Sequence, residues 1–323
     1  MRIYRSLEET PADFGPSALT IGNFDGVHLG HRRILRQLKA MADERGWKAS
    51  VLTFDPHPTR VVAPERSPRL MTSPAQRAAL MAEEGIEQVL ILPFTPELAH
   101  LSPEEFVRQL LVERLGAKAV LVGDNFRFGF RQSGNTRVLE ELGRQMGFET
   151  LVVPAVVWRG RMVSSSGIRE VIFSGRVAQA ARYLLHAYSL EGEVVRGRGV
   201  GSKQTVPTLN LAADAEVIPA AGVYVTYTRD LESSRSWESI TNVGYRPTFG
   251  KSEELTIETY LLSPLAGNAP QRIRVEFLWR VREERKFPSP EALRIQILKD
   301  VHAAERYFRR AKSWIGRVPC VSS

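Results

Sequence analysis

Two histidines stand three residues apart in the segment 22-GNFDGVHLGHRRIL-35. His28 and His31 follow a glycine-containing turn and precede the apolar spacing of an amphipathic helix. The free N–H groups and the dipole at a helix N-terminus favour an anion such as phosphate. Two imidazoles there could stabilise a charged phosphoryl transition state. A zinc site would want further ligands, and the H-E-x-x-H spacing is absent, so the pattern favours phosphate handling.

The segment 192-GEVVRGRGVGSKQTVPTLNL-211 suggests a different chemistry. Thr208 and Asn210 place two neutral oxygens on one side of an extended chain. Such hard ligands suit a Mg²⁺ ion that also binds ATP phosphates. The glycine-rich stretch before them is as typical of a plain hairpin as of a flap over phosphates.

The elements that must position these residues differ between the two halves of the chain. From residue 18 to about 185, near-continuous apolar runs alternate with helical stretches, which predicts a parallel sheet with helices on both faces. The expected strands are 18–22, 49–54, 87–94, 118–123 and 150–157, and the expected helices are 30–45, 74–84 and 103–115. The second and third helices begin with a Ser-Pro pair, a cap residue followed by proline.

After about residue 186 the apolar residues alternate with period two, which predicts a small antiparallel barrel or sandwich. The expected strands are 190–196, 222–228, 239–244, 255–262 and 272–281. A final helix is expected from Ser289-Pro290, with an apolar stripe that reaches Phe308. We therefore expect two different domains, residues 1–180 and 186–323.

The composition of the 323-residue chain, 43% hydrophobic and 25% charged, is that of a globular protein with two cores. The net charge of +8 is scattered among acidic residues, which disfavours nucleic acid and favours polyphosphate ligands. No apolar run reaches the ~18 residues of a membrane span, and the N-terminus lacks the apolar core of a signal peptide. Cys320 is the only cysteine, which excludes intrachain disulfides and thiolate metal sites. We expect a cytoplasmic protein with no membrane partner.

The motifs carry a resemblance to a known family. The stretch G-N-F-D-G-V-H-L-G-H resembles the H-x-G-H signature of the nucleotidyltransferase superfamily. With 53-TFDPHP-58, 123-GDNFRFGFRQSGN-135 and 164-SSSGIRE-170, it resembles the FMN adenylyltransferase module of the bacterial bifunctional riboflavin kinase/FAD synthetases. The segment P-T-L-N, with 242-NVGYRPTFG-250, is similar to their riboflavin kinase module. The resemblance implies a Rossmann-like nucleotidyltransferase domain with a parallel sheet, and an antiparallel kinase barrel with a terminal helix.

The resemblance also implies roles for residues. His28 and His31 would act on the ATP phosphates, and Glu258 would be the base that takes the proton of the ribityl 5′-hydroxyl. The implied ATP- and phosphate-binding residues are Gly22, Asn23, Phe24, Gly30, Asn125, Ser164, Ser165, Ser166 and Arg169. The implied kinase flap comprises Gly197, Gly199, Gly201 and Lys203, the implied flavin pocket contains His57 and Arg127, and Thr208 and Asn210 would hold the metal.

Purely structural alternatives stay open for several of these residues. The segment 164–170 is also typical of an ordinary capped helix start, and Glu258 of a solvent-facing strand residue. Asp25 and Asp55 could be structural turn residues.

The implied activity has two steps. Riboflavin and ATP give FMN and ADP, and then FMN and ATP give FAD and pyrophosphate, with Mg²⁺ in both. The partners would be these small molecules, and the protein a monomer or weak homo-oligomer. The chain departs from many relatives in reading T-V-P-T-L-N for G-F-P-T-A-N and 184-LLHAY-188 in the linker. A single live activity and a non-enzymatic flavin or nucleotide sensor are the rival hypotheses.

Overall fold

The computed structural model describes residues 1–195, 208–247 and 253–315. It divides into two compact units, Met1–Ser165 and Ser166–Ser323. The implied flap residues Gly197, Gly199, Gly201 and Lys203 lie outside the described residues. No helix in the described part of the chain is long and apolar enough to cross a membrane.

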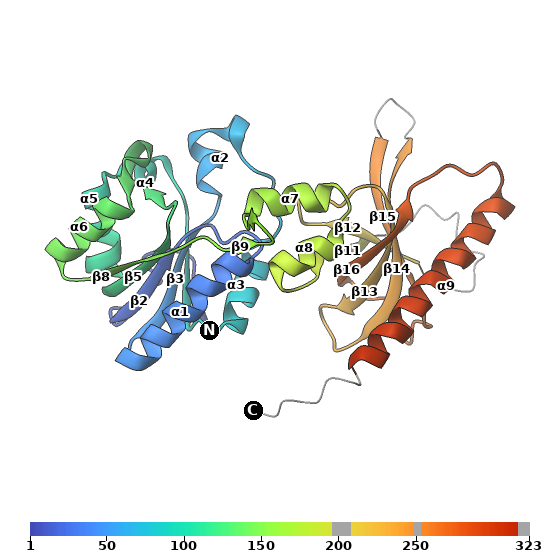
Figure 1. Cartoon of the computed structure of the whole chain (residues 1–323), viewed down its shortest axis with the longest axis horizontal. Coiled ribbons are helices and arrows are strands. Elements are labelled where there is room, and N and C mark those ends of the chain that lie inside the picture. Colours follow the sequence, from blue (N-terminus) through green and yellow to red (C-terminus); the bar gives the residue numbers. More distant parts are fainter. Residues whose placement is uncertain (196–207, 248–252, 316–323) are drawn as a thin grey trace. The chain divides into compact units, whose positions relative to one another are not determined.

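The first unit is built on a six-stranded sheet in the order β1-β4-β3-β2-β5-β8, in which every pairing is parallel (Figure 1). The strands are β1 (Arg2–Tyr4), β2 (Ser17–Ile21), β3 (Lys48–Phe54), β4 (Gln88–Leu92), β5 (Ala117–Gly123) and β8 (Glu149–Val153). All residues of β2 and β4 are buried, as their continuous apolar runs predict. The predicted parallel sheet is therefore confirmed, with β1 as an additional edge strand.

Alternate residues of the strands feed two apolar clusters, one on each face of the sheet. Ala18 joins a cluster with residues of α1 and α3, whereas Leu19 joins one with residues of η2 and α6. The helical elements are α1 (Leu29–Arg45), α2 (Pro58–Val62), η1 (Pro64–Arg66), α3 (Pro74–Glu83), α4 (Pro96–His100), α5 (Pro103–Glu105), η2 (Phe106–Arg114), η3 (Phe130–Gln132) and α6 (Thr136–Met146). Ser73 and Ser102 both form capping boxes, as the Ser-Pro pairs predict.

Two details of the first unit differ from the prediction. The expected helix 103–115 is one turn of α5 followed by the π-helix η2, which the apolar spacing does not distinguish from an α-helix. The expected strand 150–157 ends at Val153, and a separate hairpin of β9 (Val157–Trp158) and β10 (Arg161–Met162) follows. A second short hairpin joins β6 (Arg127–Phe128) to β7 (Gly134–Asn135).

The second unit contains a closed antiparallel barrel in the order β11-β12-β15-β14-β13-β16. Its strands are β11 (Tyr188–Val195), β12 (Thr208–Ala213), β13 (Gly222–Asp230), β14 (Ser236–Pro247), β15 (Glu253–Leu261) and β16 (Arg272–Glu283). Of the two predicted architectures, barrel and sandwich, the structure has the barrel. It contains β12 in addition to the five expected strands. The helix α7 (Ser165–Phe173) begins at the unit boundary, and α8 (Val177–Leu184) precedes the barrel.

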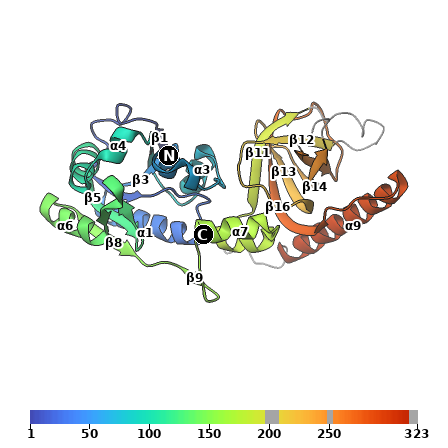
Figure 2. The same cartoon turned by 90° about the horizontal axis from the view of Figure 1, so that it is seen from above.

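The terminal helix α9 (Pro290–Ile315) runs along the outside of the barrel (Figure 1, Figure 2). Val225 and Ile240 of the barrel pack against Ala304 and Phe308 of this helix. The predicted terminal helix is thus confirmed, and its apolar stripe packs on the barrel from Val301 to Phe308, whereas Leu293 at its start is exposed. The serine of its Ser-Pro start accepts a hydrogen bond from Ala292 N–H.

The barrel interior contains a chain of buried hydroxyl groups. Thr226 Oγ1 lies 2.8 Å from both Ser239 Oγ and Thr241 Oγ1, and Thr241 Oγ1 lies 2.9 Å from Thr259 Oγ1. Buried hydroxyls need such partners, and here they satisfy one another. Because side chains alternate along a strand, the neighbours of Thr241 and Thr259 in sequence face outward.

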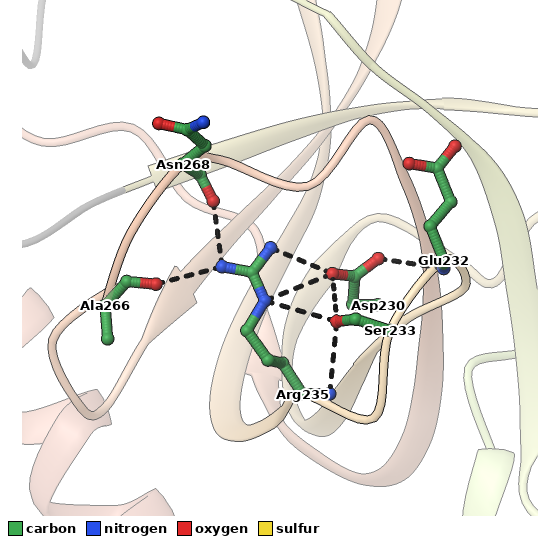
Figure 3. A network of polar contacts seen from close by, with 6 residues as sticks. All are labelled: Asp230, Glu232, Ser233, Arg235, Ala266 and Asn268. Atoms are coloured by element: carbon green, nitrogen blue, oxygen red, sulfur yellow. Dashed lines mark hydrogen bonds and ion pairs between the residues drawn. The ribbon is translucent and has the colours of Figure 1, made fainter.

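One polar network, shown in Figure 3, holds the end of the β13–β14 hairpin. The carboxylate of Asp230 accepts hydrogen bonds from Ser233 Oγ, from the Glu232 N–H and from the guanidinium of Arg235. Arg235 Nη1 also donates to the carbonyls of Ala266 and Asn268, each at 2.9 Å. The network therefore ties this hairpin to the segment between β15 and β16.

Candidate active sites

The turn between β2 and α1 is held by a buried carboxylate. Asp25 accepts hydrogen bonds from the N–H groups of Met71 and Thr72 and from the Thr72 hydroxyl, at 3.0–3.2 Å. The Gly26 N–H in turn donates to Thr72 Oγ1 at 3.0 Å. These bonds favour the structural alternative for Asp25 over a chemical role.

The same turn contains two strained residues. Phe24 and Val27 have φ values of 50° and 38°, in the left-handed region that costs a non-glycine residue roughly 1–2 kcal/mol. The Asp25 hydrogen bonds offset this strain, and Arg77 adds another, from Nη1 to the Asn23 carbonyl at 2.8 Å. The turn is thus a fixed element that places the first histidine at the start of α1.

Arg77 is a residue that the motifs did not indicate. It is only 2% exposed, and its Nε and Nη2 have no hydrogen-bond partner among the described residues. Burial lowers the pKa of Arg77, while the nearby carboxylates of Asp25 and Asp55 act in the opposite direction. A buried cation thus lies next to the turn. The sequence predicts the helix that carries Arg77 from its Ser-Pro start, but nothing in that pattern indicates that the arginine is buried.

His28 is the N-cap of α1. Its Nδ1 accepts hydrogen bonds from the N–H groups of Gly30 and His31, at 3.2 and 3.4 Å. Because Nδ1 uses its lone pair in this way, the neutral imidazole carries its proton on Nε2. A side chain at Gly30 would place its Cβ 3.1 Å from the His28 ring, so glycine permits this contact.

The two imidazoles form a stacked pair. The rings of His28 and His31 lie 3.7 Å apart at an angle of 15°, and Phe24 tilts against His31 at 5.0 Å. Burial, and then the nearby His28, lower the pKa of His31 well below its ordinary value. The Nδ1 of His31 is buried and has no partner in the described part of the protein. The pair is therefore a partly desolvated site whose imidazoles can donate hydrogen bonds to an anion.

The second predicted phosphate segment reaches the same turn. Ser165 Oγ donates to the Asp25 carbonyl at 3.1 Å, across 140 residues of sequence. Ser164 directly precedes α7 in the first unit, whereas Ser166 and Arg169 lie on α7 in the second unit.

Further predicted residues lie at the carboxyl edge of the parallel sheet, where ligands bind in such folds. Asn23 follows β2, and its amide contacts His57 Nε2 at 2.9 Å. His57 caps α2 through Nδ1, just after β3. Asn125 follows β5 and is exposed, and Arg127 is exposed on β6. Gly22 adjoins the Phe24 ring, 3.2 Å from where its Cβ would be.

The second candidate site lies on the outer face of the barrel. Asn210 of β12 is opposite Glu258 of β15 in the strand register, and Glu258 is opposite Asn242 of β14. All three are half-buried, and their strand neighbours Leu209, Leu211, Ile257, Thr259, Thr241 and Val243 are buried. Opposed side chains on one face lie about 4.5–5.5 Å apart at Cβ, so the three groups form one cluster.

The donor set of this cluster fits a weakly held hard cation. Thr208, exposed at the start of β12, and Asn210 supply neutral oxygens, and Glu258 supplies a carboxylate. Among the described residues, no group of three or more His, Cys, Asp or Glu is arranged to hold a metal. Neutral ligands suit Mg²⁺ that is held largely by nucleotide phosphates and water. The sequence did not predict Asn242 as a site residue, because only the strand register places it in this cluster.

Comparisons with known proteins match both halves of the chain. A family model described as FAD synthetase matches residues 10–167, and one described as riboflavin kinase matches residues 184–308. A bifunctional riboflavin kinase/FMN adenylyltransferase from Pseudomonas fluorescens is 34% identical over 94% of this chain and 97% of its own. The Haemophilus influenzae protein of that name is 31% identical over 95% and 99%.

A solved structure also matches the chain over most of its length. The crystal structure described as a macrolide-efflux protein from Streptococcus pneumoniae has a TM-score of 0.82 and 25% identity. The match covers 94% of this chain and 98% of that one.

Proposed function

The chain belongs to the family of bifunctional riboflavin kinase/FMN adenylyltransferases, and we propose that its two sites make FAD in two successive steps. The barrel phosphorylates riboflavin with ATP to give FMN and ADP. The parallel-sheet domain then adenylylates FMN with ATP to give FAD and pyrophosphate. The observation that carries this proposal is that both family models match, in order, around the two candidate sites.

We assign the adenylyl transfer to the turn before α1. An ionised oxygen of the FMN phosphate forms a bond with the α-phosphorus of ATP, and the bond from that phosphorus to the leaving pyrophosphate oxygen breaks. The nucleophile is already charged, so the step needs positioning and charge neutralisation more than a base. This matches a site of imidazoles, hydroxyls and helix N–H groups without an activating carboxylate.

The histidine pair supplies the charge stabilisation. His28 offers its Nε2–H, since Nδ1 is used in capping the helix. An approaching triphosphate would favour the protonated form of His31, because a nearby negative charge raises the pKa of an imidazole. The site would gain positive charge when the substrate brings negative charge. Ser164, Ser165 and Asn125 of the first unit complete the proposed phosphate contacts.

We assign the kinase step to the cluster on the barrel. The Glu258 carboxylate takes the proton of the ribityl 5′-hydroxyl as that oxygen bonds to the γ-phosphorus, and ADP leaves. Thr208 and Asn210 would hold Mg²⁺, which neutralises phosphate charge when bound. Asn242, next to Glu258, is placed to orient the same carboxylate or hydroxyl.

The remaining assignments complete the proposal. The domains are residues 1–180 for the adenylyltransferase and 186–323 for the kinase. The substrates are riboflavin, FMN and ATP, with Mg²⁺ and no nucleic acid. The protein is cytoplasmic and a monomer or weak homo-oligomer. His57 and Arg127 are assigned to the flavin pocket.

One experiment tests the two activities together. The purified protein is incubated with riboflavin, ATP and Mg²⁺, and the flavins are separated by chromatography over time. We expect FMN first and FAD afterwards. If FMN were the only product, the histidine pair would be left without its assigned reaction. If the protein converted FMN supplied as a substrate but did not convert riboflavin, the T-V-P-T-L-N segment would have disabled the kinase. No flavin product would support the sensor hypothesis.

A further inference from the structure

A groove of about 350 Å³ lies on the second unit, between α8, the turn before it and β16. In the closed barrel β16 pairs with β11 and β13, whereas Glu258 lies on β15, which pairs with β12 and β14. The groove is therefore across the barrel from the proposed kinase cluster. None of its lining residues has a role in either proposed reaction.

The groove carries a concentrated positive charge. Arg176, Arg182 and Arg280 line it, and no carboxylate does so in the described part of the chain. The exposed guanidinium of Arg182 makes no hydrogen bond or ion pair to a described residue, and Arg176 Nε donates only to Ser174 Oγ, at 2.8 Å. The nearest ionic partner of Arg280 is Glu283, at 3.7 Å, and that carboxylate is 85% exposed. Three guanidinium groups in one hollow repel one another unless an anion joins them.

Arg280 is held rigidly in place. Its side chain passes between Gly175 and Gly222, and a Cβ on either glycine would lie 2.9 Å from Arg280 Nε. Its Nη2 donates to the Ala221 carbonyl at 2.7 Å, and its guanidinium lies 5.9 Å from the centre of the Tyr224 ring. Arg280 Nε itself is buried and has no acceptor among the described residues. A preorganised guanidinium loses little entropy when it binds a phosphate.

Two further features of the groove favour a phosphate ester. The first turn of α8 lines it, and its cap residue Arg176 makes no side-chain hydrogen bond to that turn. Trp279 adds an indole that is 43% exposed and stacks at 6.4 Å on Tyr307 of α9. An indole wall beside three guanidinium groups suits an anion joined to a flat ring.

We propose that this groove binds a small phosphate-bearing molecule, and binds one with an aromatic ring more tightly than phosphate alone. Arg176 and Arg182 would meet the phosphate oxygens from the two ends of α8, Arg280 from the barrel, and Trp279 would contact the ring. The proposal concerns binding only and does not depend on the two proposed reactions.

The test uses isothermal titration calorimetry of the full chain with phenyl phosphate and with inorganic phosphate. The variant Arg176→Ala/Arg182→Ala removes two exposed groove residues, and Arg294→Ala removes an exposed arginine of α9 outside the groove. Binding at the two proposed catalytic sites would be common to all three proteins. We expect the wild type and Arg294→Ala to bind one more phenyl phosphate than the double variant, or to bind it at least about tenfold more tightly.

The ring preference has its own variant. Trp279→Leu keeps the three arginines, so it should retain phosphate binding while losing the preference for phenyl phosphate. Equal stoichiometry and affinity in the wild type, the double variant and Arg294→Ala would overturn the proposed site. A preference that survives in Trp279→Leu would remove the indole from it.

Discussion

Asn210 and Glu258 lie opposite each other on the antiparallel strands β12 and β15. They are 48 residues apart in sequence, yet this register places the proposed metal ligand Asn210 beside the proposed base. Asn242 occupies the corresponding position on β14, on the other side of Glu258. The kinase cluster is thus a row across three strands, and each member can be tested separately.

Replacing the base should separate the two activities. Glu258→Gln keeps the shape of the side chain but cannot accept the ribityl proton. We expect FMN formation to fall by about 10²–10⁴, the usual contribution of a general base, and FAD formation from supplied FMN to stay unchanged. Flavin chromatography measures both rates in one preparation. Retained kinase turnover would remove Glu258 from this role and leave the solvent-facing alternative.

His28 caps a helix, and it is also a proposed phosphate ligand, so the two roles can be tested separately. His28→Ala removes both, whereas His28→Asn keeps a good cap and removes the imidazole. We expect both variants to lose FAD formation by about 10²–10³, the usual effect of removing one transition-state donor. Only His28→Ala should lose about 1 kcal/mol of stability in urea unfolding.

The control for both His28 variants is FMN formation, which the barrel should carry out normally. If His28→Asn made FAD at the wild-type rate, His28 would be a cap alone. If both activities disappeared in a folded protein, the assignment of one activity to each site would be wrong.

The sequence predicts those structural features that depend on residues close together in the chain. The strands β2, β3, β4 and β5 carry continuous apolar runs, so the parallel sheet is predictable from its pattern. The edge strand β1 has only three residues, and none of them is fully buried, so the pattern that would reveal it is absent. The π-helix η2 has the same apolar spacing as an α-helix.

The candidate sites show the same division. His28 and His31 are adjacent in a motif, so their pairing is visible in the sequence. The position of Asn242 depends on strand register, and that of Arg77 on a hydrogen bond to a turn 54 residues away. Long-range pairings of this kind leave no local signal.

Arg77 should act on the adenylyltransferase only. Arg77→Met removes the hydrogen bond to the Asn23 carbonyl and the buried cation near Asp25 and Asp55. We expect a loss of about 1.5–3 kcal/mol from the first unit, and slower FAD formation as the strained turn before His28 relaxes. FMN formation should not change. Arg77→Lys, which keeps the charge, should form FAD at a rate between those of the wild type and Arg77→Met. If Arg77→Met formed FAD at the wild-type rate, the role of Arg77 would be limited to packing.

Asp230 gives the second unit a predictable acid dependence. Burial acts to raise the pKa of Asp230, but the hydrogen bonds from Ser233, the Glu232 N–H and Arg235 outweigh it, so the pKa is lowered. A carboxyl whose pKa is lower in the folded state contributes stability above its unfolded value of about 3.9, and this is lost as the pH falls through the folded value.

Asp230→Asn should therefore be less stable than the wild type at pH 7 by about 1.5–3 kcal/mol, since hydrogen bonds to a charged group are lost. Urea unfolding followed by Trp fluorescence from pH 7 down to pH 3 should show this difference shrinking below about pH 4, where the Asp230 carboxyl of the unfolded wild type begins to take up a proton. Glu283→Gln is the matched control, because that carboxylate is exposed and its removal should change stability little at any pH. A difference that stayed constant over this range would mean that the Asp230 network contributes through packing, and that its charge does not stabilise the hairpin.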